Sequence, residues 1–478
     1  MSFLLRRLWH SPTATTWGSL AVRLSAVLVV LPVILVRFAP PEVALWQLFS
    51  TLTMLALMLD FGLAPTFARL LAFARGGATL DEMAMMSRPV DSEQRKADPA
   101  VAAAVFSALR WLYPRLAIGA TAVMVLMGTF GLFKLVSQAT DPQAAWAAWG
   151  LVLATTGVSL WGGAYTAALL GMDKIAVMRR WEVLTGIGQL ITTVTVLLLG
   201  GKLLALVAAY QAWAVVGALR NYWLLRSLHP QLFSLPAAPR PEVMRVMWPP
   251  AWRSGLGALM SHGIIQLSGV VYSQLAPAAE VASYLLALRL MLLISQFCQA
   301  PYYSKLPRLA ELQAAGRQAD QLQLAQRGMR LAYWVFVAGA LGVALAVEPL
   351  LRALGSRTDF VPAGVWALLA LAFFAERFGA MHLQLYSLTN HIVWHIANGV
   401  TGVLMILVAV LAYPHLGAYT FPAAMLVAYA CFYCVYSAAH TRTAFKLRLL
   451  RFESLTAMPA AAALCMGLIL SLHFTIPL

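Results

Sequence analysis

Five ionisable side chains inside long apolar runs of this chain are candidates for specific chemistry. They are Arg23, Asp60, Arg289, Glu376 and Arg377. An arginine or aspartate at the centre of a membrane helix costs about 2.5–3.5 kcal/mol on insertion scales. Each therefore needs an oppositely charged partner, a water-filled cavity or a bound ion. Arginines in a cavity suit an anionic group, whereas carboxylates suit a proton or Na⁺.

Arg289 is the strongest candidate for binding an anion. Its apolar run begins near residue 279, so Arg289 lies about ten residues in, or roughly 15 Å at the helical rise. That depth is close to the middle of a bilayer whose hydrocarbon core is about 30 Å thick. The planar guanidinium group matches the spacing of phosphate oxygens, so a pyrophosphate is a suitable ligand. An ion pair with Asp60 or Glu376 is the alternative.

Arg23 and Asp60 allow more than one interpretation. Arg23 lies about six residues inside the first run, or roughly 9 Å, so its side chain can reach the headgroups or a substrate cavity. Counted from the turn at 39–41, Arg23 and Asp60 lie at similar depths on antiparallel neighbours. An Arg23–Asp60 pair is therefore expected as an alternative to substrate binding by Arg23 and ion coupling by Asp60.

Glu376 and Arg377 are adjacent in the sequence. Because neighbouring residues do not face each other on a helix, each is expected to find its partner elsewhere. Arg377 is assigned to the same substrate cavity as Arg289. Glu376 is assigned to proton or Na⁺ coupling, with a structural ion pair as the alternative.

Uncharged side chains complete the candidate site. His262 and Gln266 form a polar stripe that either packs between helices or lines a cavity. Trp161 and Tyr165, one helical turn apart, either stack on sugar rings or pack in a core. The stripe also contains three serines spaced by seven residues, at Ser254, Ser261 and Ser268. No nucleophile–base pairing, metal-ligand spacing or glycine-rich phosphate loop appears, so neither catalytic nor metal-binding residues nor a cofactor are expected.

The composition is that of an all-α integral membrane protein. Hydrophobic residues make up 61% of the 478 residues and charged residues 11%, against about 25% charged in soluble domains. Apolar runs long enough to cross a bilayer predict twelve membrane helices, and the run at 457–477 is either a thirteenth or a helix lying on the bundle. The twelve lie near 17–38, 42–73, 101–136, 143–171, 180–200, 203–226, 246–274, 279–303, 329–352, 362–388, 397–413 and 416–440.

Charge and proline content predict the orientation and the division of the chain. With a cytoplasmic N-terminus, most of the 34 lysines and arginines fall in cytoplasmic segments. This asymmetry accounts for the net charge of +16 without nucleic acid. Four prolines between 230 and 241 indicate an extended linker. We therefore expect a six-helix lobe at 1–226, a cytoplasmic linker at 227–245, a second six-helix lobe at 246–440, and a basic segment with an extra apolar helix at 441–478.

The two lobes are predicted to be pseudo-symmetric copies. The stretch at 39–70 is echoed at 276–306: both begin with Ala-Pro and Glu-Val and end on Ala-Pro, an aromatic residue, a cation and leucine. The copies lie about half the chain apart, which is typical of transporters with a parallel internal repeat. In such proteins the substrate binds between the two halves.

The second apolar run resembles that of bacterial polysaccharide flippases, the Wzx-type branch of the MOP exporter superfamily, at Leu59-Asp60-Phe61-Gly62-Leu63, Pro65 and Arg69. The eighth run, with Tyr284, Arg289, Pro301 and Leu306, is similar to the matching element of those proteins. The resemblance implies a MATE-like fold in the bacterial inner membrane. It also implies translocation of an undecaprenyl-pyrophosphate-linked oligosaccharide to the outer leaflet by alternating access.

The same resemblance implies polysaccharide biosynthesis, such as O-antigen or exopolysaccharide assembly, with the lipid-linked glycan, membrane lipids, a polymerase and glycosyltransferases as partners. Two alternatives remain. A multidrug or cation antiporter of the MATE branch needs a carboxylate in its cavity, and the first and seventh runs contain none. A membrane-embedded glycan-processing enzyme normally needs a sizeable outer loop, and the predicted outer loops are short.

The predicted orientation is testable by cysteine labelling after the four native cysteines are replaced. We expect Gln313→Cys, in the segment 304–328, to react with a membrane-impermeant maleimide only in permeabilised cells. Ser356→Cys, in a predicted outer loop, should react in intact cells. Labelling of Gln313→Cys in intact cells would show that the topology is the reverse of the predicted one.

Overall fold

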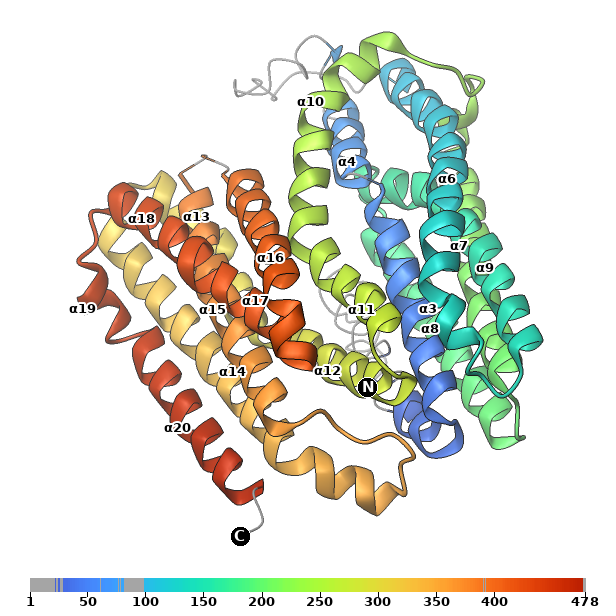
Figure 1. The fold of residues 1–478 in the computed structure, drawn as a ribbon. Helices are drawn as coiled ribbons and strands as arrows, with labels where there is room; N and C mark the ends of the chain where they lie inside the picture. Colours follow the sequence, from blue (N-terminus) through green and yellow to red (C-terminus); the bar gives the residue numbers. More distant parts are fainter. Residues whose placement is uncertain are drawn as a thin grey trace, which may run out of the picture. The chain divides into compact units, whose positions relative to one another are not determined.

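The protein is built from α-helices joined by short turns, as the composition predicts (Figure 1). The computed structural model describes residues 22, 25, 29–60, 62–75, 77, 79–80, 99–389, 391 and 393–475. Among these residues, nine helical stretches are long and apolar enough to cross a membrane. They are α3 (Pro40–Met58), α6 (Pro99–Val136), α7 (Pro142–Gly171), α8 (Ile175–Leu198), α9 (Leu203–Leu228), α12 (Ala278–Tyr303), α14 (Gln318–Leu354), α15 (Ala363–Ser387) and the stretch Trp394–Phe445.

Several predicted membrane runs are interrupted helices. The second run is divided at Asp60 into α3 and α4 (Leu63–Arg75), and Gly62 in this turn has a φ of 68°. π-helical turns interrupt two others, giving α10 (Pro241–Ala258), η2 (Leu259–Gly263) and α11 (Ile264–Leu275), and α17 (Thr420–Ala428), η4 (Tyr429–Tyr433) and α18 (Cys434–Phe445). The Trp394–Phe445 stretch begins with α16 (Trp394–Leu416), which turns back on α17 through Gly417.

The remaining helices are shorter. The 3-10 turn η1 (Pro230–Phe233) lies in the predicted linker, and α13 (Leu306–Ala314) precedes α14. The short helix α19 (Leu449–Glu453) leads into α20 (Ala457–Thr475). Helix α20 covers the run predicted at 457–477 and packs against α14 and α15. Thus every predicted run after the first coincides with a helix or a helix pair.

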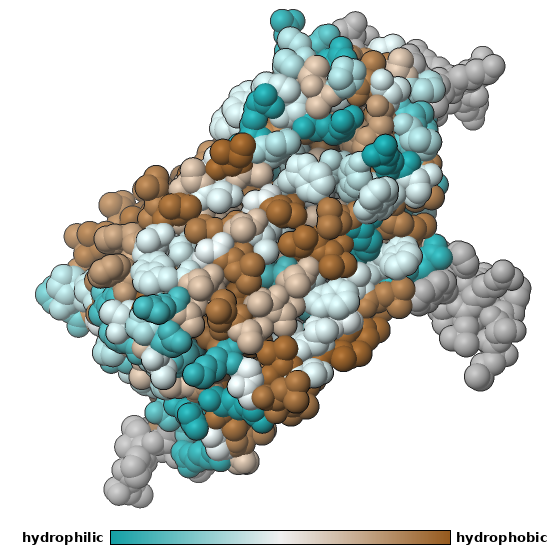
Figure 2. All heavy atoms as spheres, turned by 90° about the vertical axis from the view of Figure 1, so that its right-hand side faces the viewer, coloured by the Kyte–Doolittle hydropathy of each residue, from teal (hydrophilic) through white to brown (hydrophobic). Residues whose placement is uncertain are grey.

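Many large apolar side chains face outward, as they must in a protein that contacts lipid. On α6, Leu126 is 73% exposed and Phe130 74% exposed, and on α16 Leu411 is 74% exposed. Figure 2 shows such apolar side chains spread over much of the face drawn there. This surface would be unstable in water but suits the hydrocarbon core.

The chain divides into two compact units, one ending at Leu259 and the other beginning at Met260. This boundary lies inside η2, whereas the sequence analysis placed the start of the second lobe at 246. The difference arises because α10 packs against α4 and α6, and the predicted linker at η1 packs against α6 and α9. We call these the first unit and the second unit.

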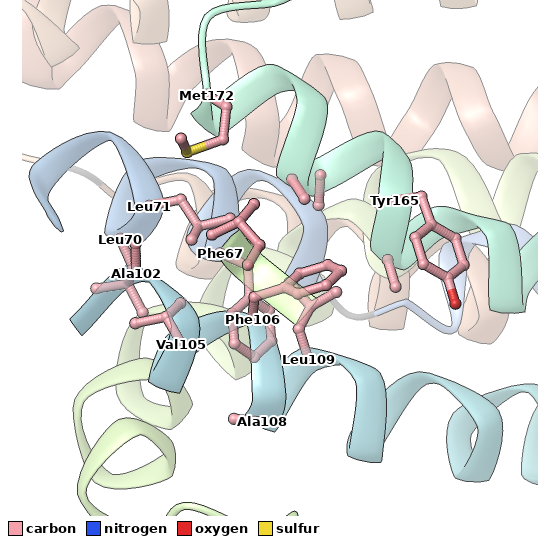
Figure 3. Close-up of a cluster of buried hydrophobic side chains, with 14 of the residues drawn as sticks. Phe67, Leu70, Leu71, Ala102, Val105, Phe106, Ala108, Leu109, Tyr165 and Met172 are labelled. Carbon is pink, nitrogen blue, oxygen red and sulfur yellow. The ribbon is translucent and has the colours of Figure 1, made fainter. Parts of the chain in front are cut away.

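In the first unit, α7 packs against α9, α6 and α4. Part of its core lies where α4 and α6 meet α7 (Figure 3). There Phe67, Leu70 and Leu71 of α4 pack with Val105 and Phe106 of α6, and all are fully buried. This contact fixes the two helices that follow the interruption at Asp60.

The second unit repeats this packing scheme. Helix α15 packs against α17 and α18, just as α7 packs against α9 in the first unit. Likewise, α16 packs against α17, just as α8 packs against α9. Helix α12 packs against α14 as the α3–α4 pair packs against α6. The repeated stretches at 39–70 and 276–306 thus form equivalent helices, which supports the predicted internal duplication.

The shared Glu-Val of the repeat has the same local place in both copies. Glu42 and Glu280 each occupy the third position of their helix, where a carboxylate interacts favourably with the helix dipole. Glu42 accepts a hydrogen bond from the Thr140 backbone at 2.9 Å, and Glu280 accepts one from the Tyr272 hydroxyl at 3.0 Å. The glutamates therefore fasten the start of each helix to another segment.

A glycine permits the close contact of α7 with α9. A Cβ atom at Gly162 would lie 2.6 Å from Cβ of Ala218, whereas one at Gly150 on the same helix would meet nothing within 4 Å. Small residues at such crossings let membrane helices approach closely.

We expect Gly162→Ala to lower the melting temperature in detergent by several degrees, since overpacking costs about 1–3 kcal/mol. Gly150→Ala is the matched control, and it should be neutral or slightly stabilising because alanine is the better helix former. Equal melting temperatures for the two variants would show that the contact does not limit stability.

Candidate functional site

The first unit contains a polar pocket of about 280 Å³ between α8 and α9. Most of its side chains come from these two helices, and Val22 adds an apolar contact. The lining residues are Val22, Glu182, Thr185, Gly186, Gln189, Trp213, Ala214, Gly217, Arg220 and Asn221. An arginine, a carboxylate, two amides and an indole in one small pocket can bind a polar or charged ligand.

Arg220 donates hydrogen bonds to two uncharged side chains. Its Nη1 donates to Thr185 Oγ1 at 2.6 Å, and its Nε and Nη2 donate to Asn221 Oδ1 at 3.0 and 2.9 Å. Asn221 is buried, and its Nδ2 donates to Thr166 Oγ1 of α7 at 2.9 Å. This network joins α7, α8 and α9 and fixes the guanidinium group at the pocket.

The carboxylate in the pocket also has a cationic neighbour. Arg179 Nη1 lies 2.6 Å from Glu182 Oε2, one helical turn away, and both side chains are mostly buried. Among the described residues named here, Arg179 and Arg220 accompany one carboxylate, so the sum of their charges is positive.

The indole and amide groups are also fixed. Trp213 Nε1 donates to Thr192 Oγ1 at 2.8 Å, and Gln189 Nε2 donates to the Tyr210 carbonyl at 3.1 Å. Gly188 leaves room for the indole, because a Cβ atom there would lie 2.3 Å from the Trp213 ring. The pocket thus offers a rigid aromatic wall beside hydrogen-bonding groups.

Neither Glu182 nor Arg220 was among the candidates from the sequence. Both lie inside predicted membrane runs, at 180–200 and 203–226, but near their ends, where charged residues are ordinarily at the headgroups. The available signal was that α8 and α9 are antiparallel neighbours, which brings a residue near the start of one beside a residue near the end of the other.

In the second unit, Arg377 is 5% exposed and lies between α15 and α12. Its guanidinium donates to Gln299 Oε1 at 3.3 Å and to Ser295 Oγ. Its Nη2 also lies 3.2 Å from Glu376 Oε2. The expectation that these neighbours must find partners elsewhere is therefore wrong for the ion pair, because both side chains are long enough to curl toward each other.

Glu376 and Arg377 lie near both α12 and η4. Electrostatic interactions link its carboxylate to Tyr429 and Tyr433 of η4 and to Cys434. The Glu376–Arg377 pair thus joins α12, α15 and the π-helical turn. Such turns often occur at functional sites.

The other predicted cavity residues lie on separate elements. Arg289 is half-buried on α12, Gln266 is buried on α11, and His262 is exposed in η2. Ser268 of the predicted polar stripe is buried, and its hydroxyl lies 2.9 Å from the hydroxyl of Tyr284. Arg23 and the side chains of Ser254 and Ser261 lie outside the described residues.

Asp60 has a local structural role. Its Oδ2 accepts a hydrogen bond from the Ala64 backbone at 2.9 Å, which caps the first turn of α4. Its carboxyl group also faces the phenol of Tyr113 on α6. Asp60 therefore helps to define the helix interruption.

Trp161 and Tyr165 form part of an aromatic cluster in the first unit. Their rings are 4.9 Å apart, and Tyr165 also contacts Tyr222 at 5.2 Å and Phe106 at 6.2 Å. Tyr165 is 5% exposed (Figure 3). In this structure both side chains contribute to core packing.

Comparison with solved structures supports the MATE-like architecture. The lipid II flippase MurJ in an inward closed conformation has a TM-score of 0.63 at 11% identity, covering 97% of this chain and 94% of its own. An inward-facing multidrug resistance MATE family transporter of the MOP superfamily also scores 0.63 at 15% identity, covering 89% of this chain and 98% of its own. The MATE multidrug transporter DinF-BH in complex with R6G scores 0.57 at 15% identity, covering 92% and 97%.

No protein-family model and no curated protein matches the sequence. The structural similarities establish an all-α membrane fold of the MOP type.

The buried ion pair of the second unit predicts strong coupling between Glu376 and Arg377. Removal of one partner from a buried pair leaves an uncompensated charge and costs about 3–5 kcal/mol. We therefore expect Arg377→Met to unfold at a clearly lower temperature in detergent, and Glu376→Gln/Arg377→Met to recover much of the loss. Additive effects in this double-mutant cycle would exclude a stabilising pair.

Proposed function

We propose that the protein translocates an undecaprenyl-pyrophosphate-linked oligosaccharide from the cytoplasmic to the outer leaflet of the bacterial inner membrane. The polar pocket around Arg220 carries this proposal. Its guanidinium group suits phosphate oxygens, and its indole and amide groups suit a glycan. The MOP-type fold supports transport by alternating access, and one protein with this fold is described as a lipid II flippase.

Two of the groups that accept hydrogen bonds from Arg220, on Thr185 and Asn221, are neutral. An anionic ligand can replace a hydroxyl or an amide and gain a charge-assisted hydrogen bond. The carboxylate of Glu182 is already 2.6 Å from Arg179, which lessens its repulsion of an incoming phosphate. These features support the binding of an anion in the pocket.

Further residues are proposed to contact the substrate during the transport cycle. Arg289 and Arg23 are proposed as additional pyrophosphate contacts, and His262 and Gln266 as cavity-lining groups. Arg377 is better explained by its buried pair with Glu376. Trp161 and Tyr165 remain proposed sugar contacts only if the aromatic cluster opens during transport.

The proposed cycle requires an energy source. We propose proton or Na⁺ coupling through Glu376, with Asp60 as a second carboxylate, and no organic cofactor. The proposed partners are the lipid-linked glycan, a polysaccharide polymerase, glycosyltransferases and membrane lipids. The N-terminus is proposed to be cytoplasmic, in agreement with the distribution of lysine and arginine.

A MATE-type multidrug or cation antiporter is the second candidate. Glu182 supplies a carboxylate to the pocket, which the first and seventh runs alone would not provide. Multidrug transporters of the MATE family share the fold over most of the chain. The two candidates differ in the sign of the charge they bind, so the roles of Glu182 and Arg220 separate them.

We expect Arg220→Ala to reduce glycan translocation in proteoliposomes at least tenfold, because the anion contact is lost. Arg220→Lys should retain partial activity, since it keeps the charge but loses the planar geometry. Arg226→Ala is a matched control: Arg226 is exposed near the end of the same helix, where it contacts Tyr222.

Expression level and melting temperature must be measured for each variant, because Arg220 also joins three helices. Wild-type translocation by a folded Arg220→Ala variant would contradict the proposal. Loss of efflux of a cationic dye in Glu182→Gln, with glycan translocation unaffected, would support the antiporter instead.

A further inference from the structure

The turn that joins α18 to α20 is strongly basic. Arg442, Lys446, Arg448 and Arg451 are all exposed within ten residues of the chain. The carboxylate in the same stretch, Glu453, is buried and bound elsewhere. Clusters of lysine and arginine beside a membrane helix attract anionic headgroups.

Exposed leucines lie among these cations. Leu450 is 80% exposed and Leu455 is 56% exposed, whereas Phe452 between them is 5% exposed. The short helix α19 therefore anchors one face in the protein and presents leucine and arginine outward. This combination is typical of segments that lie at the boundary between headgroups and acyl chains.

An apolar groove of about 320 Å³ lies directly beside this turn. Phe374 and Phe378 of α15 form one wall, Leu449 and Leu450 of α19 another, and the first turns of α20 the third. From α20 come Ala457, Met458 and Ala461. Because Met458 is 51% exposed and Leu450 80% exposed, the groove is open at the surface of the second unit.

Glu453 also borders the groove, but its carboxylate is satisfied within the protein. Its Oε1 lies 3.0 Å from His382 Nε2, and its Oε2 accepts a hydrogen bond from Thr456 at 2.7 Å. The carbonyl of His382 accepts a hydrogen bond from Thr441 at 3.0 Å. These bonds hold α19 against α15 and α18, so the basic turn and the groove keep a fixed relation.

We propose that this groove and turn bind an anionic phospholipid of the bilayer leaflet at the basic end of the second unit. One acyl chain lies in the groove against Phe374, Phe378 and Met458. The phosphate group interacts with Arg448 and Arg451, which flank the exposed Leu450. The bound lipid thereby fills an apolar surface that the protein itself leaves open.

Charge complementarity selects the occupant. A zwitterionic phospholipid can fill the groove equally well but gains less from the cations of the turn. A polyprenyl phosphate shares the negative headgroup but has a much longer tail. The groove is bordered by only the first turns of α20, so it holds a short length of chain, and the rest of a polyprenyl tail would gain no contact there. We therefore assign the site to a glycerophospholipid such as phosphatidylglycerol.

The experiment compares lipid binding by the full-length protein in detergent, using native mass spectrometry. We expect phosphatidylglycerol to bind at least tenfold more tightly than phosphatidylcholine, and this preference to weaken at high salt. Arg448→Gln/Arg451→Gln should abolish the preference. Arg308→Gln/Arg317→Gln is the matched control, because these exposed arginines are paired with Glu311 and Asp320.

A second variant tests the groove independently of charge. Ala461→Trp should fill it and remove tight phosphatidylglycerol binding, whereas Met466→Trp, at an exposed position on the same helix, should not. Unchanged binding in folded Arg448→Gln/Arg451→Gln and Ala461→Trp variants would overturn the proposal. Tighter binding of undecaprenyl phosphate than of phosphatidylglycerol, lost in the same variants, would overturn the assignment of the occupant.

Discussion

The need to satisfy charged groups inside an apolar helix bundle determines much of the local architecture. Arg377 draws Ser295 and Gln299 of α12 toward α15, and Arg220 connects Thr185 of α8 with Asn221 of α9. An ionic group without such partners would carry a cost of several kcal/mol at the bilayer centre. These two arginines therefore help to specify which helices are neighbours, in addition to any role in transport.

Close contacts between helices occur on the same helix pairs as these polar groups. Gly162 brings α7 near Ala218 of α9, and the same pair of helices carries the Thr166–Asn221 hydrogen bond. In the second unit, a Cβ atom at Gly379 would lie 2.3 Å from the Tyr433 ring in η4. Both units thus use a glycine at the equivalent crossing, which is consistent with duplication of one helical scheme followed by divergence of the polar groups.

The sequence predicted the helices, their order and the repeat because those properties depend on the length of apolar runs and on local motifs. It did not predict the interruption at Asp60 or the π-helical turns. Hydropathy is averaged over a long run, so it detects neither a turn within the run nor the extra residue of a π-helical turn. It also missed the Glu376–Arg377 pair, because side-chain spacing on a helix neglects how far glutamate and arginine can bend. Arg220 and Glu182 were missed because their place in one pocket depends on how α8 and α9 pack, which neither helix encodes alone.

The difference between the two arginine environments favours the first unit as the place where an anion is bound. Arg377 is paired with a carboxylate, so an incoming phosphate would have to displace Glu376 and leave that charge buried. The hydroxyl of Thr185 and the amide of Asn221 accept hydrogen bonds from Arg220, and each can turn to a water molecule or another side chain at much lower cost. The proposed transport site must bind and release its ligand in each cycle, and hydrogen bonds to a hydroxyl and an amide are easier to exchange than a buried ion pair with Glu376.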